Sequence, residues 1–186
     1  MQPQLTHVGI YTRQLAAMER FYTSIFGLVV TDRGTLKRLE NLNVVFLSGD
    51  VDSHHQLVLI ECPSNRPESE STIHQLSFKV GGLGELRRLA EAVKQAGVAP
   101  LNPIDHGNAW SVYSADPDGN GIEIYLDTDW YVAQPHSRPL ALDASDDEVR
   151  RTTEAAVKAD PTWSTRAAWQ EKLAARLAHS KEEHSA

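Results

Sequence analysis

The sequence predicts an α+β fold in which two βαβββ units follow one another and a helical tail ends the chain. One observation is that the same order of strand and helix patterns occurs twice within residues 1–126. Another is that the helical pattern of each half stops at a glycine, Gly27 and Gly97, a residue that readily adopts the left-handed conformation that closes a helix. Repeated order with matching stop signals indicates an internal duplication. We expect the two units to form one curved, partly closed sheet around a cavity, with the helices outside.

The first unit begins at residues 5–12, where apolar and polar side chains alternate as they do in a half-buried strand. The spacing then becomes helical, and one apolar stripe contains Leu15, Met18, Phe21, Tyr22 and Ile25. Three further strand patterns follow, at residues 28–30, 43–47 and 56–60. Together they predict the order strand, helix and three strands.

The second unit repeats this order. It begins with an alternating segment at residues 73–80 and continues with a helical stripe of Leu86, Leu89, Ala90, Val93 and Ala96. Its last two strands, at residues 110–114 and 122–126, flank the sequence Asp-Pro-Asp-Gly-Asn-Gly. Proline, glycine and asparagine favour the backbone angles of tight turns, so these strands are predicted to form a β-hairpin.

Residues 127–186 form a C-terminal extension outside the paired module of residues 1–126. An irregular segment comes first, and Ser145-Asp146-Asp147-Glu148 is then a capping box that opens a helix. Asp160-Pro161 breaks it, and a second helix carries Trp169, Leu173 and Leu177 at a spacing of four. Because this tail cannot form a core of its own, we expect it to pack on the module or on a second subunit, in a homodimer or a higher homo-oligomer.

Composition limits the class of protein. The net charge of −7 argues against nucleic acid or an anionic membrane as a partner. No apolar run approaches transmembrane length, and the polar start lacks the apolar segment of a signal peptide. The single cysteine, Cys62, excludes an internal disulfide framework and a thiolate metal cluster. We therefore expect a cytoplasmic protein.

Three polar residues occupy matching strand faces. His7, Gln75 and Glu123 each lie opposite an apolar set of their own strand, so they are expected to line the cavity. Two neutral donors and one carboxylate, with coordination positions left open, are typical of a facial-triad metal site. Alone, His7 would be read as a hydrogen-bonded strand histidine and Glu123 as a solvated carboxylate. Their occurrence together in a duplicated unit favours metal binding.

Two neighbours of these positions also matter. In the simplest hairpin register Tyr113 faces Glu123, and opposed side chains have Cβ atoms about 5 Å apart. His74 is a rival to Gln75, because imidazole is the commoner ligand. Alternation places His74 with Leu76 on the apolar side, and a one-residue slip of the strand would reverse this assignment.

Four segments resemble the vicinal oxygen chelate superfamily, which includes glyoxalase I, antibiotic-resistance proteins and type I extradiol dioxygenases. They read LTHVGIY…ERFYTSIFGL, HHQLVLIE, HQLSFKV and HGNAWSVYSADPDGNGIEIY, and the likeness spans about residues 5–126. The His-His doublet and the His…Tyr…Glu order of the last segment are closest to the extradiol group. In that group Fe(II) is usually held by two histidines and a glutamate. Carried over by position, the resemblance implies metal ligands His7, Gln75 and Glu123.

The resemblance also implies roles for three further residues. His55 matches the acid/base histidine of the extradiol group, while Tyr113 and His106 match residues that contact the substrate. The expected function is a metal-dependent ring cleavage of a catechol-like aromatic diol by O2. Gln75 replaces the second histidine ligand, and an amide oxygen is a harder, weaker donor for Fe(II) than imidazole. Mn2+ or another divalent ion is therefore an alternative to Fe(II).

Two other functions stay open at this point. One is a glyoxalase-like isomerase or lyase that uses a divalent ion other than iron. It needs an additional carboxylate, for which Glu61 is the only candidate on a lining strand. The other is a non-catalytic protein of the same fold that binds a planar small molecule.

Overall fold

The computed structural model describes residues 5–36, 41–63 and 73–183. Within it the chain divides into two compact units that interleave along the sequence. The first contains Met1–Leu76, Glu91–Pro100 and Ser114–Ile122, and the second contains Ser77–Ala90, Leu101–Tyr113 and Glu123–Ala186. Each unit is described by itself.

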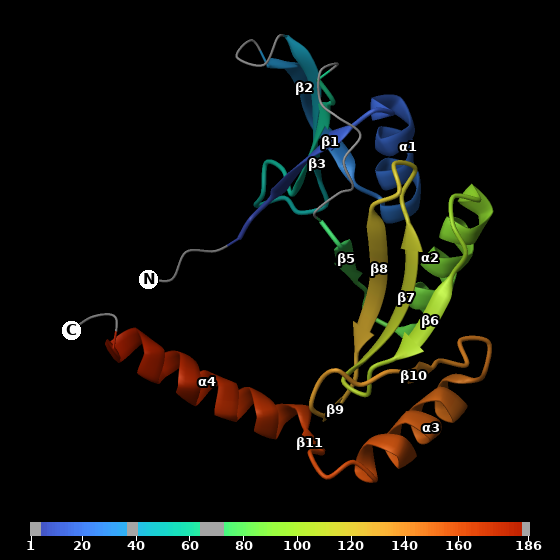
Figure 1. Ribbon diagram of the computed structural model, residues 1–186, viewed down its shortest axis with the longest axis vertical. Helices are drawn as coiled ribbons and strands as arrows, with labels where there is room; N and C mark the ends of the chain where they lie inside the picture. The colour runs from blue at the N-terminus through green and yellow to red at the C-terminus, as the bar shows by residue number, and fades with distance from the viewer. Residues whose placement is uncertain (1–4, 37–40, 64–72, 184–186) are drawn as a thin grey trace. The chain divides into compact units, whose positions relative to one another are not determined.

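The predicted βαβββ order occurs twice (Figure 1). The elements of the first repeat are β1 (Val8–Thr12), α1 (Leu15–Phe26), β2 (Val29–Leu36), β3 (Leu42–Ser48) and β4 (Leu57–Glu61). Those of the second are β5 (Gln75–Lys79), α2 (Leu83–Ala96), β6 (Asn102–Asp105), β7 (Ala109–Ala115) and β8 (Gly121–Asp127). The order of elements read from the sequence is confirmed, and the strand β2 extends beyond the predicted residues 28–30.

Strand pairing shows the duplication more directly than the sequence does. The first repeat forms a four-stranded sheet in the order β1-β4-β3-β2. In the five-stranded sheet the strands of the second repeat have the equivalent order, β5-β8-β7-β6, and β10 is added beyond β6. In the first sheet β1 and β4 run parallel, with Val8 opposite Leu57 and Thr12 opposite Glu61. The predicted α+β class is confirmed, and each repeat supplies one sheet.

Both predicted helix stops are confirmed. Gly27 has a φ of 69° and its N–H donates to the carbonyl of Tyr22, which closes α1. Gly97 follows α2 with a φ of 68°. Residues with a Cβ are strained in this region, so glycine suits both positions. The apolar stripes of the two helices are buried at Met18, Phe21, Tyr22, Leu83, Leu86, Leu89, Ala90 and Val93.

The hairpin turn between β7 and β8 is held by the buried carboxylate of Asp116. Its Oδ1 accepts hydrogen bonds from the N–H groups of Asp118 (3.0 Å) and Asn120 (2.9 Å). Its Oδ2 accepts from the hydroxyl of Tyr22 in α1 at 2.8 Å. Burial raises the pKa of Asp116, and these hydrogen bonds partly offset the effect. The turn is therefore fastened to the first helix inside the core of the first unit.

The C-terminal extension is part of the second unit. It contains β9 (Trp130–Tyr131), β10 (Arg138–Pro139), α3 (Asp146–Lys158), β11 (Ser164–Thr165) and α4 (Arg166–Glu183). The predicted helix start is confirmed, because Ser145 Oγ accepts from the N–H of Glu148 at 3.2 Å. Helix α3 buries Val149, Thr153 and Val157. Among the described residues, no helix is long and apolar enough to span a membrane.

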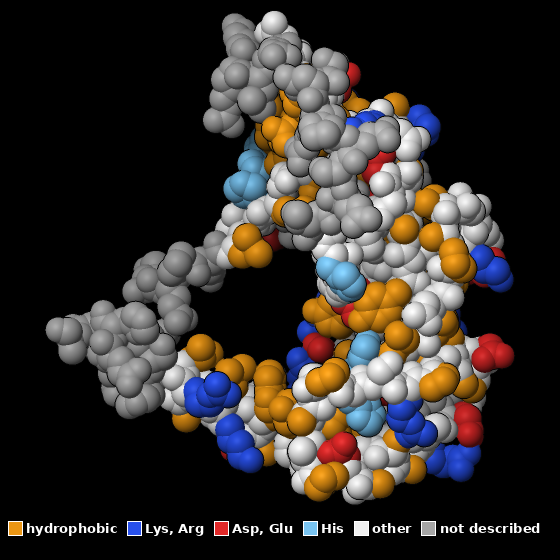
Figure 2. Space-filling view, viewed as in Figure 1, with side chains coloured by type: hydrophobic (Ala, Val, Ile, Leu, Met, Phe, Trp, Pro, Cys, Tyr) orange, Lys and Arg blue, Asp and Glu red, His pale blue; other side chains and the backbone are white. Residues whose placement is uncertain are grey.

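Two contacts fix this extension in place. The buried hydroxyl of Thr153 in α3 accepts from Trp110 Nε1 at 2.7 Å and donates to Asp105 Oδ2 at 2.8 Å. The Trp169 ring of α4 stacks on Tyr131 with ring centroids 5.3 Å apart. Farther along α4 apolar side chains are exposed beside Lys and Arg side chains (Figure 2), and Leu177 is 44% exposed.

Candidate functional site

The carboxylate of Glu123 accepts hydrogen bonds from three hydroxyl groups of the second unit. Ser111 Oγ and Tyr113 Oη each lie 2.8 Å from Oε1. Ser77 Oγ lies 2.6 Å from Oε2. Alternation along β8 makes this possible, since Ile122 and Ile124 are buried on the other face. The predicted pairing of Tyr113 with Glu123 is confirmed.

His106 extends this network beyond Tyr113. Its Nε2 lies 2.9 Å from Tyr113 Oη, and its Nδ1 lies 2.7 Å from the carbonyl oxygen of His136. Burial, and then the hydrogen bond and charge of Glu123, raise the pKa of Tyr113 to about 12. The phenol therefore keeps its proton at neutral pH. His106, Tyr113 and Glu123 thus form one continuous polar chain within the second unit.

A second group, of imidazoles, lies in the first unit. The rings of His7 and His55 are in edge contact with centroids 4.4 Å apart. The Nδ1 atoms of His54 and His55 lie 2.9 Å apart, and Phe46 packs against both of these rings. Burial, followed by the charges of His7 and His54, lowers the pKa of His55. His55 is therefore neutral at neutral pH and able to accept a proton.

Gln75 is the first residue of β5, and its Oε1 lies 3.0 Å from His74 Nδ1. The backbone of His74 leaves no room for a side chain at residue 121, because a Cβ on Gly121 would lie 2.2 Å from the carbonyl oxygen of His74. Ser77, two residues along the same strand, bonds Glu123. Ser77, on the face of β5 that was predicted to be polar, therefore contacts the carboxylate of Glu123.

The structure brings the predicted site residues together in two groups. His106, Tyr113 and Glu123 are joined in the second unit, and His7 and His55 are in contact in the first. Gln75 also belongs to the first unit. Within the described residues, no group of three or more His, Cys, Asp and Glu side chains could hold a metal ion. The predicted ligand set has only two such side chains, since its third member is a glutamine.

The donor chemistry of this predicted set fits a divalent ion. Ligating carboxylates are usually oriented by hydrogen bonds of their own, and Glu123 is held in this way by Ser77, Ser111 and Tyr113. Thr6 Oγ1 lies 3.1 Å from His7 Nδ1. If that hydroxyl accepts, the lone pair of a neutral His7 ring is on Nε2, the tautomer that can ligate a metal there.

Sequence reasoning missed the hydroxyls and the backbone partner of His106. Strand alternation does place Ser77 and Ser111 on the faces of Gln75 and Tyr113, but a serine carries no distinctive signal. The carbonyl of His136 lies thirty residues after His106, in a segment without regular periodicity. No pattern in the sequence indicates this contact.

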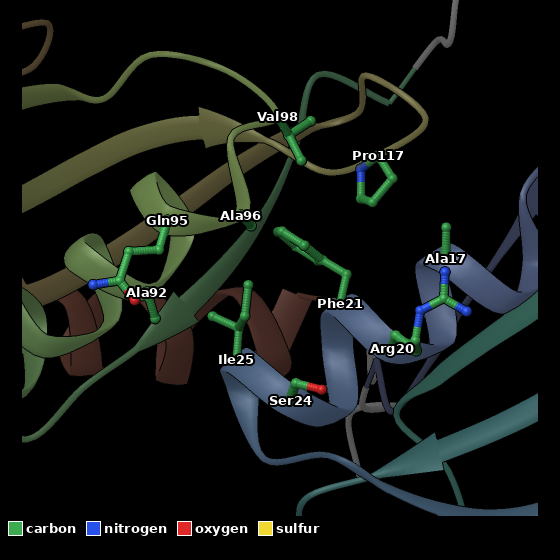
Figure 3. Close-up of a pocket in the computed structure, with 10 residues that line it drawn as sticks. All are labelled: Ala17, Arg20, Phe21, Ser24, Ile25, Ala92, Gln95, Ala96, Val98 and Pro117. Atoms are coloured by element: carbon green, nitrogen blue, oxygen red, sulfur yellow. The ribbon is translucent and has the colours of Figure 1, made fainter.

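The first unit also has an open groove between α1 and α2, of about 380 Å³ (Figure 3). Its lining is mostly small or apolar, with Ala17, Phe21, Ile25, Ala92 and Ala96 among the residues, and includes Arg20 and Gln95. None of the predicted site residues lines it. We therefore do not identify this groove with the candidate site.

Comparison with known proteins gives a consistent set of relatives. The family model described as Glyoxalase/Bleomycin resistance protein/Dioxygenase superfamily matches residues 4–124. Biphenyl-2,3-diol 1,2-dioxygenase 2 of Rhodococcus globerulus is 29% identical over 128 residues, 67% of this chain and 63% of that protein. Biphenyl-2,3-diol 1,2-dioxygenase 3 of the same organism is 31% identical over 130 residues, 67% and 64% of the two chains. The chain thus spans less than two thirds of the length of these relatives.

Solved structures agree on the fold. A glyoxylase/bleomycin resistance protein/dioxygenase domain from Frankia sp. EAN1pec matches with a TM-score of 0.56 and 24% identity, over 69% of this chain and all of that chain. The fosfomycin resistance protein of Listeria monocytogenes, in complex with Mn(II) and sulfate, matches with a TM-score of 0.53 and 19% identity. That match covers 69% of this chain and 95% of the other.

Proposed function

Because this chain belongs to the Glyoxalase/Bleomycin resistance protein/Dioxygenase superfamily, we propose that it is an extradiol-type dioxygenase acting on a catechol-like aromatic diol. The observation that carries the proposal is the chain of His106, Tyr113 and Glu123. The two relatives from Rhodococcus globerulus, which are named as biphenyl-2,3-diol dioxygenases, support the choice of substrate class.

In this proposal His7, Gln75 and Glu123 hold a divalent ion. A divalent ion held there would supply the positive charge that binds both oxygens of a diol and O2 beside each other. The resemblance noted in the sequence favours Fe(II), and the amide of Gln75 favours Mn2+ or another ion that accepts oxygen donors.

The remaining steps belong to side chains. Tyr113 and His106 orient the diol through hydrogen bonds, since their polar atoms continue the hydrogen-bonded chain that begins at Glu123. The neutral ring of His55 accepts a proton from the diol and returns it later as an acid. Ser77 and Ser111 keep the carboxylate of Glu123 in one orientation, which is the kind of preorganisation that catalysis by charge requires.

The geometry does not favour the glyoxalase-like alternative that relies on Glu61. Val8, which follows His7, lies opposite Leu57, whereas Glu61 lies opposite Thr12 at the other end of the same strand pair. A strand rises about 3.3 Å per residue, so the two ends lie about 13 Å apart. Glu61 Oε2 instead accepts hydrogen bonds from the side chain (2.9 Å) and N–H (3.1 Å) of Asn43.

The test is to load the purified protein anaerobically with Fe(II), Mn2+ or Mg2+ and then to add catechol or 2,3-dihydroxybiphenyl in air-saturated buffer. Oxygen uptake with formation of a ring-cleaved product supports the proposal, and Glu123→Gln is expected to abolish both. Metal binding without oxygen uptake would favour the isomerase or lyase. Diol binding without any metal would favour a non-catalytic binding protein.

A further inference from the structure

The geometry points to Gln134, in the C-terminal extension, as a positioning residue that fixes the ring of His106. The extension lies outside the repeats that carry the other proposed site residues. The effect of Gln134 on diol binding rests on the proposed function, whereas its effect on the His106 ring does not.

The first step is the tautomer of His106. Its Nδ1 lies 2.7 Å from the carbonyl oxygen of His136, and a carbonyl can only accept a hydrogen bond. Nδ1 must therefore carry a proton. In the neutral ring the lone pair is then on Nε2, which lies 2.9 Å from Tyr113 Oη.

The second step is the side-chain amide of Gln134, which hydrogen-bonds to the backbone of both His106 and His136. Its Nε2 donates to the carbonyl of His106 at 2.9 Å and to Asn108 Oδ1 at 3.1 Å. Its Oε1 accepts from the N–H of His136 at 3.0 Å. The opposite orientation of the amide would set its oxygen against the backbone carbonyls of His106 and Val132 and its NH2 group against the N–H of His136. One side chain thus holds the backbone on both sides of the His106 Nδ1 contact.

The loop around His106 is closely packed, which supports a positional role. Gly107 has a φ of +74°, and a Cβ there would lie 2.7 Å from a methyl of Val132 and 2.9 Å from a methyl of Val157. The N–H of Gly107 donates to Asp105 Oδ1 at 2.8 Å. Both valines belong to the extension, so the extension shapes this loop as well as orienting the ring.

The consequence concerns the single proton of Tyr113. Tyr113 Oη has two neighbours that can accept this proton, His106 Nε2 at 2.9 Å and Glu123 Oε1 at 2.8 Å. With its lone pair on Nε2, His106 competes with Glu123 for the proton of Tyr113. If the ring adopted the other tautomer, Nε2 would donate to Tyr113 and the phenol would have to donate to Glu123. Gln134 therefore keeps His106 as an acceptor toward Tyr113 and toward a diol hydroxyl.

The experiment is nitrogen NMR of protein labelled with 15N-histidine, at pH 8 and without metal or diol. The His106 signals are assigned by their loss in His106→Gln. In the parent we expect Nδ1 to carry the proton and Nε2 to be the bare nitrogen. Gln134→Met keeps the length of an exposed side chain and loses its hydrogen bonds. In this variant we expect the proton of the His106 ring to be no longer confined to Nδ1. Gln170→Met, at an exposed glutamine of α4, is the matched control and is expected to keep the tautomer of the parent.

The outcomes separate this inference from the proposed function. A parent His106 with its proton on Nε2 overturns the inference, as does an unchanged tautomer in Gln134→Met. A changed tautomer with the thermal melting temperature of the parent supports it, whether or not the loaded protein cleaves diols. If diol cleavage is found, we expect the KM for catechol in Gln134→Met to rise about five- to tenfold, the worth of one hydrogen bond, with a smaller change in kcat.

Discussion

The hydroxyl of Tyr113 lies 2.8 Å from Oε1 of Glu123, on the strand across the hairpin. Burial, together with this contact, raises the pKa of the phenol to about 12. The contact also links a residue proposed to contact the diol to a residue proposed to hold the metal.

The first prediction is that Glu123→Gln lowers the pKa of Tyr113. The variant removes the negative charge and replaces it with a neutral amide, so the tyrosinate form is no longer opposed by a neighbouring anion. Burial still acts, and the pKa is expected to remain above the ordinary value of about 10. NMR titration of protein labelled at the tyrosine ring measures this directly. Asp118→Asn, which removes a charge at a half-buried position of the turn, is expected to leave the Tyr113 titration unaltered.

The second prediction concerns His55. His55→Ala should lower turnover of the loaded protein by about 10²- to 10⁴-fold, because it removes proton transfer. Diol binding should change much less, since an acid/base group contributes little to uniform binding. Single-turnover kinetics with a separate binding titration distinguish the two effects. His54→Ala is the control at the adjacent histidine, and equal losses in both variants would show that the pair acts only through packing.

Part of this arrangement could be predicted from the sequence because it depends on local periodicity. The pairing of Tyr113 with Glu123 follows from a short hairpin and strict alternation, and the helix ends follow from Gly27 and Gly97. Other features depend on registers that no local pattern sets. The position of Glu61 far from Val8 comes from the parallel pairing of β1 with β4. The contact between His106 and His136 joins two loops.

The third prediction tests how the extension stabilises the second unit. Thr153→Val keeps the shape of the side chain but leaves Trp110 Nε1 and Asp105 Oδ2 without this buried partner. The cost for unsatisfied buried groups is about 1–3 kcal/mol of unfolding free energy. Thr152→Val, one residue away and exposed, is expected to have little effect. Denaturant unfolding of both variants gives the comparison, and equal stabilities would contradict a structural role for this contact.

The fourth prediction is a pH dependence of stability at Asp127. Hydrogen bonds from Arg166 and Lys79 lower its pKa against an opposing effect of burial. The two cations lie 2.7 and 2.5 Å from Oδ2. A lowered folded-state pKa means that the stabilisation is present above the unfolded value of about 3.9 and is lost as pH falls through the folded value.

Asp127→Asn should therefore lower the free energy of unfolding at pH 7, by about 1 kcal/mol or less for a partly exposed pair. The difference from the parent should shrink as the pH falls below about 4, the unfolded pKa of an aspartate. Asp143→Asn, at an exposed aspartate, is the control. A difference that stays constant from pH 7 to pH 3 would show that the charge of Asp127 is not responsible.

The last prediction concerns Gln75, the proposed ligand that departs from the histidine of the extradiol group. Its amide oxygen lies 3.0 Å from His74 Nδ1, so binding a metal there requires this contact to be exchanged. Gln75→His supplies an imidazole, a better donor for Fe(II), and is expected to raise iron affinity more than Mn2+ or Mg2+ affinity. His74→Ala is the matched control. It removes the neighbouring ring and should not weaken iron binding if Gln75 occupies the ligand position. Anaerobic titrations of the parent and both variants make the comparison. Equal iron affinity in the parent and Gln75→His, or loss of metal binding in His74→Ala, would assign the ligand to His74 instead.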